Sequence, residues 1–200
     1  RARELGHIFP IHTAEPAAEG QMVRQGRGEM VDFIRQRGFW DHSFRPRGNG
    51  GSINYLYDLG VLDERTLCVH VIHVSDEEIR ILANEGVKIC LCPGSNQFLK
   101  TGIAPVQHFL EHGLLPALGT DSLASNPELS LWREMRILTE MYPDIDLSSV
   151  FRMATLGGAR ALGVEHSFGT LEPGKSSDLL LIPTCAAYTT EDQVYRFMVT

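Results

Sequence analysis

The stretch Leu114–Asn126, LLPALGTDSLASN, places a single carboxylate, Asp121, after a short apolar run. The run Leu114–Leu118 has the length and composition of a buried strand. The residues that follow Asp121 are small and polar, without a basic neighbour. A carboxylate delivered into a loop in this way indicates a metal ligand or a proton shuttle, although for this segment alone an N-capping aspartate is the favoured alternative.

Two other segments have the same layout, a hydrophobic run that ends in a residue able to bind a metal or move a proton. They are Gly6–Glu15, which contains His12 and Glu15, and Thr66–His73, which contains His70. Parallel strands that carry functional groups at their C-terminal ends form the active sites of (β/α) barrels. Three such segments in one chain favour a shared site over three unrelated structural roles.

Strand-like and helix-like segments alternate along most of the chain. Helices are expected at residues 19–37, 53–59, 75–86, 105–112, 129–141 and 147–162, and strands at the run ending at His12 and at residues 67–70, 87–92 and 114–118. Ser75–Glu78 is a capping box, and Pro93–Asn96 is expected to be a loop. From His70 to Cys92 to Asp121 the spacing is 22 and then 29 residues, close to the roughly 30 residues of a βαβ unit.

Two features complete the fold prediction. The chain has no Gly-x-Gly-x-x-Gly turn after an early strand, which favours a barrel over a doubly wound dinucleotide-binding sheet. After Phe168 the sequence changes character, with a turn-rich segment, Gly169–Lys175, and a continuous apolar run, Asp178–Ile182, that predicts a strand. Residues 1–167 and 168–200 are therefore expected to be separate parts, the second a small β element.

Charge and composition limit the classes of partner. A net charge of −7, with the 18 lysines and arginines scattered, lacks the basic patch of a nucleic-acid binder, and the local cluster Arg35–Arg47 is interpreted as a solvated helix end and loop. No apolar run approaches a membrane span or a signal sequence, so a cytoplasmic protein with a small-molecule substrate is expected. The four cysteines (Cys68, Cys90, Cys92, Cys185) include no Cys-x-x-Cys pair, which predicts buried reduced thiols.

Seven motifs follow one another in a fixed order. They are His12-x-x-Glu15, His70-x-x-His73 with Ser75–Glu78, Pro93-x-Ser95-Asn96, Gly102–Val106, Gly119–Asn126, Thr155–Gly163 and Gly169–Leu179. In this order they resemble the amidohydrolase superfamily, in its aminohydrolase and chlorohydrolase branch. The resemblance implies an α/β fold, namely the second half (strands five to eight) of a metal-dependent (β/α)8 barrel at residues 1–167, with part of a small β-sandwich at residues 168–200.

The resemblance also implies roles for individual residues. One divalent metal, zinc or alternatively iron, would lie at the C-terminal mouth of the barrel, with His12 and Asp121 as ligands. Glu15 corresponds to the proton-transferring acid and base, His70 to the histidine that polarises the attacking water, and Asp121 also to the group that takes the proton of that water. Asn96 and Ser122 are the expected substrate-binding residues.

The reaction implied is deamination of an aminopurine-type nucleoside by metal-activated water. The motif Cys92–Asn96 together with Gly119–Asn126 resembles the aminodeoxyfutalosine deaminases of menaquinone biosynthesis. Deaminases of adenosylhomocysteine or methylthioadenosine are the next alternative, and a chlorohydrolase acting on a triazine-like ring is the third.

One departure from the family pattern is important. The first two metal ligands of the family form a His-x-His pair, and this chain has none; the pair His108/His112 lacks the Glu of His-Glu-x-x-His and is interpreted as a polar helix face. We therefore expect the C-terminal half of a longer protein, inactive and without a firmly held metal in isolation. Such a half would pair with the missing N-terminal half or with another copy as a homo-oligomer. The competing hypothesis is an inactive relative that serves as an interaction or structural module.

Overall fold

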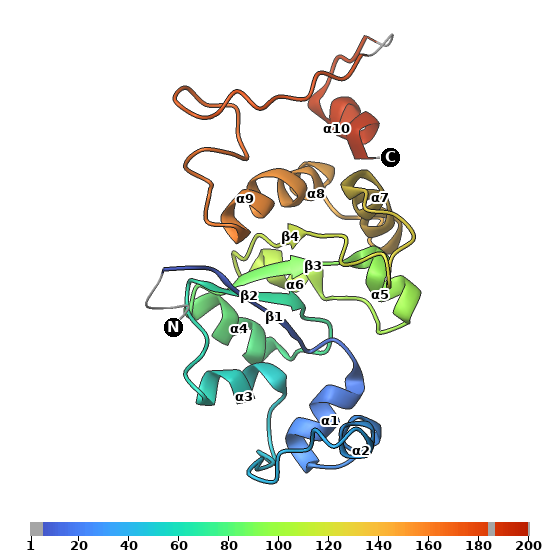
Figure 1. Ribbon diagram of the computed structural model, residues 1–200. Coiled ribbons are helices and arrows are strands. Elements are labelled where there is room, and N and C mark those ends of the chain that lie inside the picture. Colours follow the sequence, from blue (N-terminus) through green and yellow to red (C-terminus); the bar gives the residue numbers. More distant parts are fainter. Residues whose placement is uncertain (1–5, 184–186, 200) are drawn as a thin grey trace. The chain divides into compact units, whose positions relative to one another are not determined.

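The computed structural model describes residues 6–183 and 187–199 (Figure 1). The chain divides into two compact units. The first is formed by Arg1–Ile89 with Lys100–Leu114, and the second by Cys90–Leu99 with Leu115–Thr200. Helices alternate with parallel strands, which confirms the expected α/β fold.

The first unit contains a pair of parallel strands, β1 (Phe9–Thr13) and β2 (Thr66–His70), which lie side by side in Figure 1. Phe9 pairs with Thr66, and Thr13 pairs with His70. Because the strands are parallel, their carboxyl ends meet at the same edge. Strand β2 is almost entirely buried, as expected for a parallel strand made of a continuous apolar run.

The single helix expected at residues 19–37 is in fact two helices, α1 (Ala17–Gln25) and α2 (Glu29–Gln36). Gly26 ends α1 in the left-handed conformation, with φ 62°, and its N–H donates to the carbonyl of Met22. Glycine is the residue that adopts this conformation at low cost. A Cβ atom at Gly26 would also lie 2.6 Å from Cγ of Pro46. Both the backbone conformation and the lack of space therefore favour glycine at this position.

A buried carboxylate joins the next two helices, α3 (Ser52–Asp58) and α4 (Asp76–Asn84). The predicted capping box is confirmed, because Ser75 Oγ accepts from the Glu78 N–H and the Ser75 N–H donates to Glu78 Oε2 at 3.0 Å. Glu78 Oε1 also accepts from the backbone N–H of Ile53 at 3.1 Å. One side chain thus satisfies backbone donors at the start of both helices. Helix α6 (Val106–Glu111) completes the helices of this unit.

Parallel pairing recurs in the second unit. The second half of β3 (Lys88–Leu91) pairs with β4 (Ala117–Leu118), with Cys90 opposite Ala117 and Leu91 opposite Leu118. Strand β4 is shorter than the expected run from Leu114, because Pro116 has no N–H to donate to a ladder. The prediction of a loop after β3 is wrong, because residues Pro93–Leu99 form a helix, α5. Proline is well suited to the first position of a helix.

The remaining helices of the second unit lie within the predicted helical segments 129–141 and 147–162, except that residues 191–199 form a helix where a β element was expected. They are α7 (Leu131–Met141), α8 (Leu147–Arg152), the π-helical turn η1 (Met153–Gly157), α9 (Gly158–Ala161) and α10 (Glu191–Val199). Asp146 caps α8 by accepting from the N–H groups of Ser148 and Ser149. A Cβ atom at Gly157 would clash with the carbonyl of Pro116, so η1 packs directly on the backbone next to β4.

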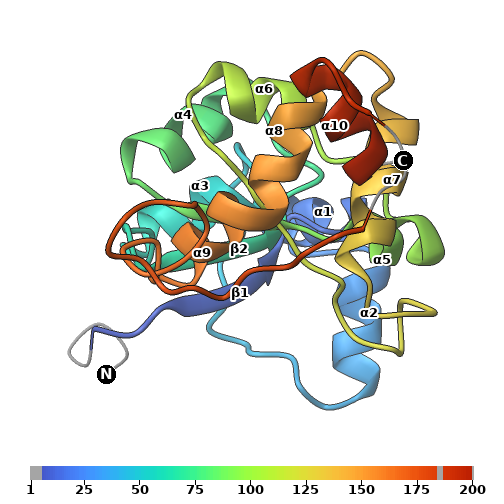
Figure 2. The ribbon, with the colours of Figure 1, turned by 90° about the horizontal axis from the view of Figure 1, so that it is seen from above.

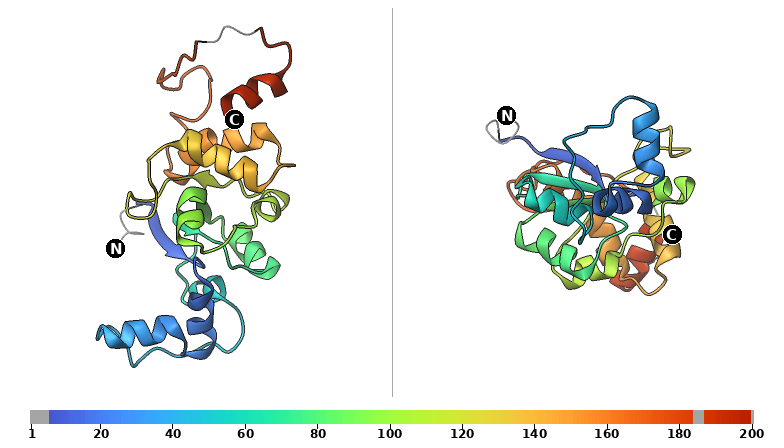
Figure 3. Two further views of the ribbon diagram at one scale, coloured as in Figure 1. Left: turned by 90° about the vertical axis from the view of Figure 1, so that its right-hand side faces the viewer. Right: turned by 90° about the horizontal axis from the view of Figure 1, so that it is seen from below.

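The strand expected at Asp178–Ile182 does not form. Among the described residues after Phe168 none is assigned to a strand, and residues 169–183 and 187–190 lie outside helices and strands (Figure 3). Leu179, Leu180 and Leu181 are exposed, Leu181 at 93%. A strand needs a partner for its backbone groups, and no described segment pairs with this one. Helix α10 instead packs beside α8 (Figure 2).

The predictions for thiols and membrane segments can be checked for part of the chain. Cys68, Cys90 and Cys92 are free thiols; Cys68 and Cys92 are buried and Cys90 is half-buried. Cys185 lies outside the described residues. Within the described ranges, no helix combines the length and the apolar character needed to cross a bilayer.

The break between α1 and α2 can be tested with alanine substitutions. Gly38 has a similar φ of 73° but open space around its Cβ position, so Gly38→Ala should cost only the left-handed strain, about 1–2 kcal/mol. Gly26→Ala should lower the free energy of unfolding by at least about 1 kcal/mol more, because the methyl group also overlaps Pro46. Urea denaturation followed by circular dichroism measures both. Equal losses would show that the contact with Pro46 has no energetic consequence.

Candidate active site

Two imidazoles lie together at the carboxyl ends of β1 and β2. The ring centroids of His12 and His70 are 5.2 Å apart, with the ring planes tilted by 39°. His12 is exposed, whereas the side chain of His70 is 1% exposed. The pairing of Thr13 with His70 brings the two strand ends into register, so residues 58 positions apart in sequence become neighbours.

Glu15 is the third member of this group. Its Oε2 lies 3.8 Å from Nε2 of His70. The other carboxylate oxygen, Oε1, is buried and has no hydrogen-bond partner in the structure. A buried carboxylate oxygen without a donor is costly for the fold, and this cost points to a chemical rather than a structural role for Glu15.

The backbone at these strand ends adopts an unusual conformation. Ala14, His70 and Val71 have φ of 52°, 75° and 49°, and in the second unit Asp121 has φ of 57°. The left-handed region costs a non-glycine residue about 1–2 kcal/mol, and such residues cluster at functional sites. Three of the four predicted catalytic and metal-binding residues are therefore in this conformation or next to a residue that is.

Glu19, which the sequence did not single out, holds the loop that carries Glu15. Its carboxylate accepts from the Ala14 N–H at 2.8 Å, from the Thr13 hydroxyl at 3.2 Å and from the Glu15 N–H at 3.2 Å. Glu19 lies in the first turn of α1, where an acidic side chain is a common helix-start feature. Its sequence position therefore gave no sign of the contact with the strand end.

In the second unit Asp121 is fixed by two hydroxyl groups. Ser95 Oγ and Ser125 Oγ donate to Asp121 Oδ2 at 2.8 and 2.9 Å. Hydroxyl donors stabilise the charged form of a carboxylate. Neither serine was among the sequence candidates, although both belong to motifs that were.

Of the predicted substrate-binding residues, Asn96 directly follows Ser95 and Ser122 precedes Ser125 by three positions. Asn96 is buried in α5, and Ser122 is exposed, where its Oγ accepts from the Ala124 N–H at 3.3 Å. The structure contains no substrate, so their binding role stays a prediction.

A fully buried carboxylate, Glu134 on α7, supports the Asp121 loop. It accepts from the Gly94 N–H at 2.6 Å and from Asn126 Nδ2 at 2.7 Å. Asn126 Nδ2 also donates to the carbonyl of Thr120 at 2.7 Å, and Asn126 Oδ1 accepts from Arg133 Nη1 at 2.8 Å. The start of α5 and the loop after β4 are thus held through one side chain, a role that periodicity could not reveal because Glu134 reads as a surface position.

The buried thiols do not supply a nucleophile. Burial, with a smaller effect of the Glu19 carboxylate, raises the pKa of Cys68 to about 12. The hydrogen bond with Cys90 and burial raise the pKa of Cys92 above its ordinary value. Because the thiolate is the reactive form, both residues are inert at neutral pH.

The donor set of the first unit fits a transition metal only in part. His12 and His70 offer imidazole nitrogens, which suit zinc or iron, and Glu15 offers an oxygen without a hydrogen bond. Catalytic zinc usually has three protein ligands. No group of three or more His, Cys, Asp or Glu that could hold a metal occurs within residues 6–183 and 187–199. The convergence of Asp121 with His12 and His70 stays a prediction.

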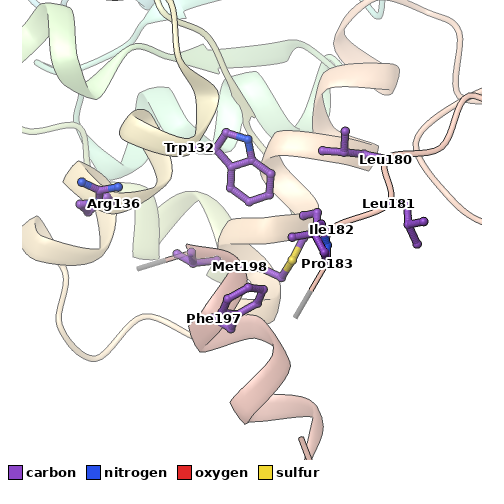
Figure 4. A pocket seen from close by; sticks show the side chains of 9 residues that line it. Trp132, Arg136, Leu180, Leu181, Ile182, Pro183, Phe197 and Met198 are labelled. Atoms are coloured by element: carbon purple, nitrogen blue, oxygen red, sulfur yellow. The ribbon is translucent and has the colours of Figure 1, made fainter. Parts of the chain in front are cut away.

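Each unit contains one notable cavity among its described residues. The cavity in the second unit, about 360 Å³, is lined by Trp132, Phe197 and the apolar segment that includes Leu180 (Figure 4). Arg136 is its charged residue, and no proton-transferring or metal-binding side chain lines it. The cavity in the first unit, about 440 Å³, includes both His12 and Glu15 in its wall. The first unit therefore holds the candidate active site.

The chain is similar to known proteins over most of its length. Residues 1–199 match the model of the family described as "Amidohydrolase family". The chain is 42% identical over 188 residues to a 5-methylthioadenosine/S-adenosylhomocysteine deaminase of Moorella thermoacetica, a match that covers 90% of this chain and 39% of the relative. It is 36% identical over 143 residues to an S-triazine hydrolase of Gordonia rubripertincta, covering 68% of this chain and 30% of the relative.

A similar solved structure is that of an adenosine deaminase from Xanthomonas campestris with bound zinc. The TM-score is 0.70 at 31% sequence identity, with 88% of this chain and 37% of the other covered. The chain thus spans between 30% and 39% of the length of these three proteins.

The role assigned to Glu19 can be tested by hydrogen exchange. Glu19→Ala should accelerate exchange of the Ala14 and Glu15 amide protons by about tenfold or more, because both lose their acceptor. Glu29→Ala, at an exposed acidic residue of α2, is the matched control and should leave both amides unchanged. NMR-detected exchange gives the rates. Unchanged protection in Glu19→Ala would mean that the loop is held by other contacts.

Proposed function

The chain belongs to the amidohydrolase family, and we propose that it is part of a metal-dependent hydrolase that deaminates an aminopurine-type nucleoside. The observation that carries this proposal is the grouping of His12, His70 and Glu15, of which His12 and Glu15 line the cavity, with a Glu15 oxygen that has no structural partner. The deaminase and adenosine deaminase relatives support the reaction class. Hydrolytic deamination replaces the amino group on a ring carbon with oxygen and releases ammonia.

We assign each step of proton transfer in this reaction to a residue of the chain. Glu15 gives a proton to the ring nitrogen beside the reacting carbon, a general-acid role for which a positioned carboxylate is suited. His70, held rigid by burial, orients the attacking water. Asp121 takes one proton of that water and passes it to the departing amino group, and Glu15 recovers the other proton of the water in place of the one it gave to the ring nitrogen. The hydroxyls of Ser95 and Ser125 hold the Asp121 carboxylate in one orientation.

The proposal includes one divalent metal, zinc or alternatively iron, for which His12 and Asp121 would be ligands. A bound metal would lower the pKa of a water molecule from 15.7 to about 7, which makes the nucleophile available at neutral pH. We propose that residues 1–167 are strands five to eight of a (β/α)8 barrel and that residues 168–200 contribute to a β-sandwich. The share of each relative that the chain spans, 30% to 39%, supports this interpretation.

Two substrate classes have support among the relatives. We favour 5-methylthioadenosine or S-adenosylhomocysteine over aminodeoxyfutalosine and its link to menaquinone biosynthesis, and the 42% identity to a deaminase of the former class supports this choice. The S-triazine hydrolase relative supports the second candidate, displacement of chloride from a triazine-like ring. Release of ammonia from a nucleoside, as opposed to chloride from a triazine, separates the two candidates.

The division of roles can be tested in the full-length protein that contains this chain. Glu15→Gln should lower kcat by about 10²–10⁴-fold with the metal content unchanged, because it removes a proton carrier and not a ligand. Asp121→Asn should lower both kcat and metal content. Glu111→Gln, at an exposed position of α6, is the control. Equal metal loss in the Glu15 and Asp121 variants would show that the roles are misassigned.

The isolated chain offers a separate test of the proposal that further ligands are needed. After dialysis against a mild chelator it should retain less than one zinc per chain and release no ammonia from adenosine-type nucleosides, because His12 and Asp121 are two ligands whereas catalytic zinc usually has three protein ligands. Metal analysis and an ammonia assay measure this, and light scattering should detect self-association through unpaired edges. Stoichiometric zinc together with ammonia release would overturn the proposal that the chain needs further ligands. The same result would exclude the alternative of a non-catalytic module.

A further inference from the structure

The cavity beside Glu15 has apolar walls and two buried oxygen atoms without hydrogen bonds. Its volume is about 440 Å³, within the range of small-molecule sites. Met22, Met30 and Phe44 contribute to its walls, which come from α1, α2, α3 and the loop between α2 and α3. The two oxygens are Glu15 Oε1 and Ser52 Oγ. Glu15 has a role in the proposed reaction, but nothing so far accounts for Ser52.

Ser52 is not required to cap its own helix. It is the first residue of α3 and only 4% exposed. The backbone donors around it already have acceptors, since the Ile53 N–H donates to Glu78 Oε1 and the Gly51 N–H donates to Asn54 Oδ1. A buried hydroxyl without a partner costs free energy, and at a cavity wall that cost is recovered when a ligand supplies the hydrogen bond.

The charges around the cavity exclude an anionic occupant. Its acidic members, Glu15 and Glu19, would repel a carboxylate, and no lysine or arginine is among the described residues that line it. The nearby guanidinium of Arg47 is engaged elsewhere: it lies over the ring of Tyr55, 5.6 Å from the centroid, and forms an ion pair with Asp58 at 3.3 Å. A carboxylate buried in this cavity would lose hydration without gaining a partner.

We propose that this cavity binds the sugar and the 5′ substituent of the nucleoside, that Ser52 hydrogen-bonds a sugar hydroxyl, and that a small neutral 5′ group is selected over a charged amino-acid tail. The inference rests on the proposed function: with the ring nitrogen at Glu15, the rest of the cavity is left for the groups attached to the ring. Thioether side chains such as Met22 and Met30 adapt their shape to an apolar substituent. The chain would then prefer methylthioadenosine to adenosylhomocysteine.

Two methionines in the wall allow a direct binding test that needs neither metal nor turnover. The chain is labelled with ¹³C at its methionine methyl groups and titrated with 5′-methylthioadenosine. The Met22 and Met30 resonances should shift, while that of Met153, buried in the second unit, should not. S-adenosylhomocysteine should bind at least about tenfold more weakly, because the carboxylate of its zwitterionic tail would lose hydration without gaining a cationic partner among the lining residues.

Variants of serine test the role of the hydroxyl. Ser52→Ala should weaken binding of 5′-methylthioadenosine by about three- to tenfold, the usual value of one hydrogen bond between neutral groups. Ser43→Ala, an exposed serine next to the wall residue Phe44, should leave binding unchanged. The ligand-free Met22 and Met30 resonances, which belong to the same unit as Ser52, report whether Ser52→Ala is folded. If it is not, Ser52→Cys, which keeps the volume but donates weakly, takes its place.

Three results would overturn the proposal: no shift at Met22 and Met30, equal affinity for the two nucleosides, or full affinity in the folded Ser52 variant. Failure of the proposed function looks different. In that case the methionine shifts and the selectivity would be observed, but the full-length protein would deaminate neither nucleoside.

Discussion

The left-handed backbone at the carboxyl ends of β1 and β2 is the constraint on which the candidate site depends. Ala14, His70 and Val71 occupy a conformation that is unfavourable for residues with a Cβ atom, and for β-branched valine above all. Hydrogen bonds between the two strand ends offset part of this conformational cost, since the N–H groups of Ile72 and His73 both donate to the carbonyl of Ala14. The sharp turn after each strand keeps His12, Glu15 and His70 close together.

Carboxylates in this protein have two distinct uses, and their hydrogen bonds distinguish them. Glu19, Glu78 and Glu134 accept hydrogen bonds from backbone N–H groups of other elements and so connect these elements. These hydrogen bonds hold each carboxylate in one position between two elements, which is a structural role. Glu15 keeps a buried oxygen without any donor. The same residue type is therefore fixed into the fold at three positions and left available for chemistry at a fourth.

The cavity next to Glu15 connects the reaction class to the choice of substrate. Its apolar wall with one free hydroxyl, that of Ser52, matches a nucleoside whose remote end is uncharged. Specificity of this kind comes from groups that lack a partner when the wrong ligand binds. Because this cavity lies entirely within the first unit, the proposed preference for an uncharged 5′ substituent would be encoded in a chain that spans well under half of the length of its relatives.

The sequence by itself determined the α/β alternation, the parallel strands and the capping box at Ser75. It also determined that His12, Glu15, His70 and Asp121 lie at strand ends. All of these features follow from local periodicity and short motifs. Only the tertiary structure decided the split between α1 and α2, the helix at Pro93–Leu99, the absence of a strand at Asp178–Ile182 and the supporting roles of Glu19 and Glu134. These depend on long-range contacts. A glutamate in a helix has the same sequence pattern whether it faces water or a backbone N–H of another element, and an apolar run becomes a strand only where a partner strand satisfies its backbone.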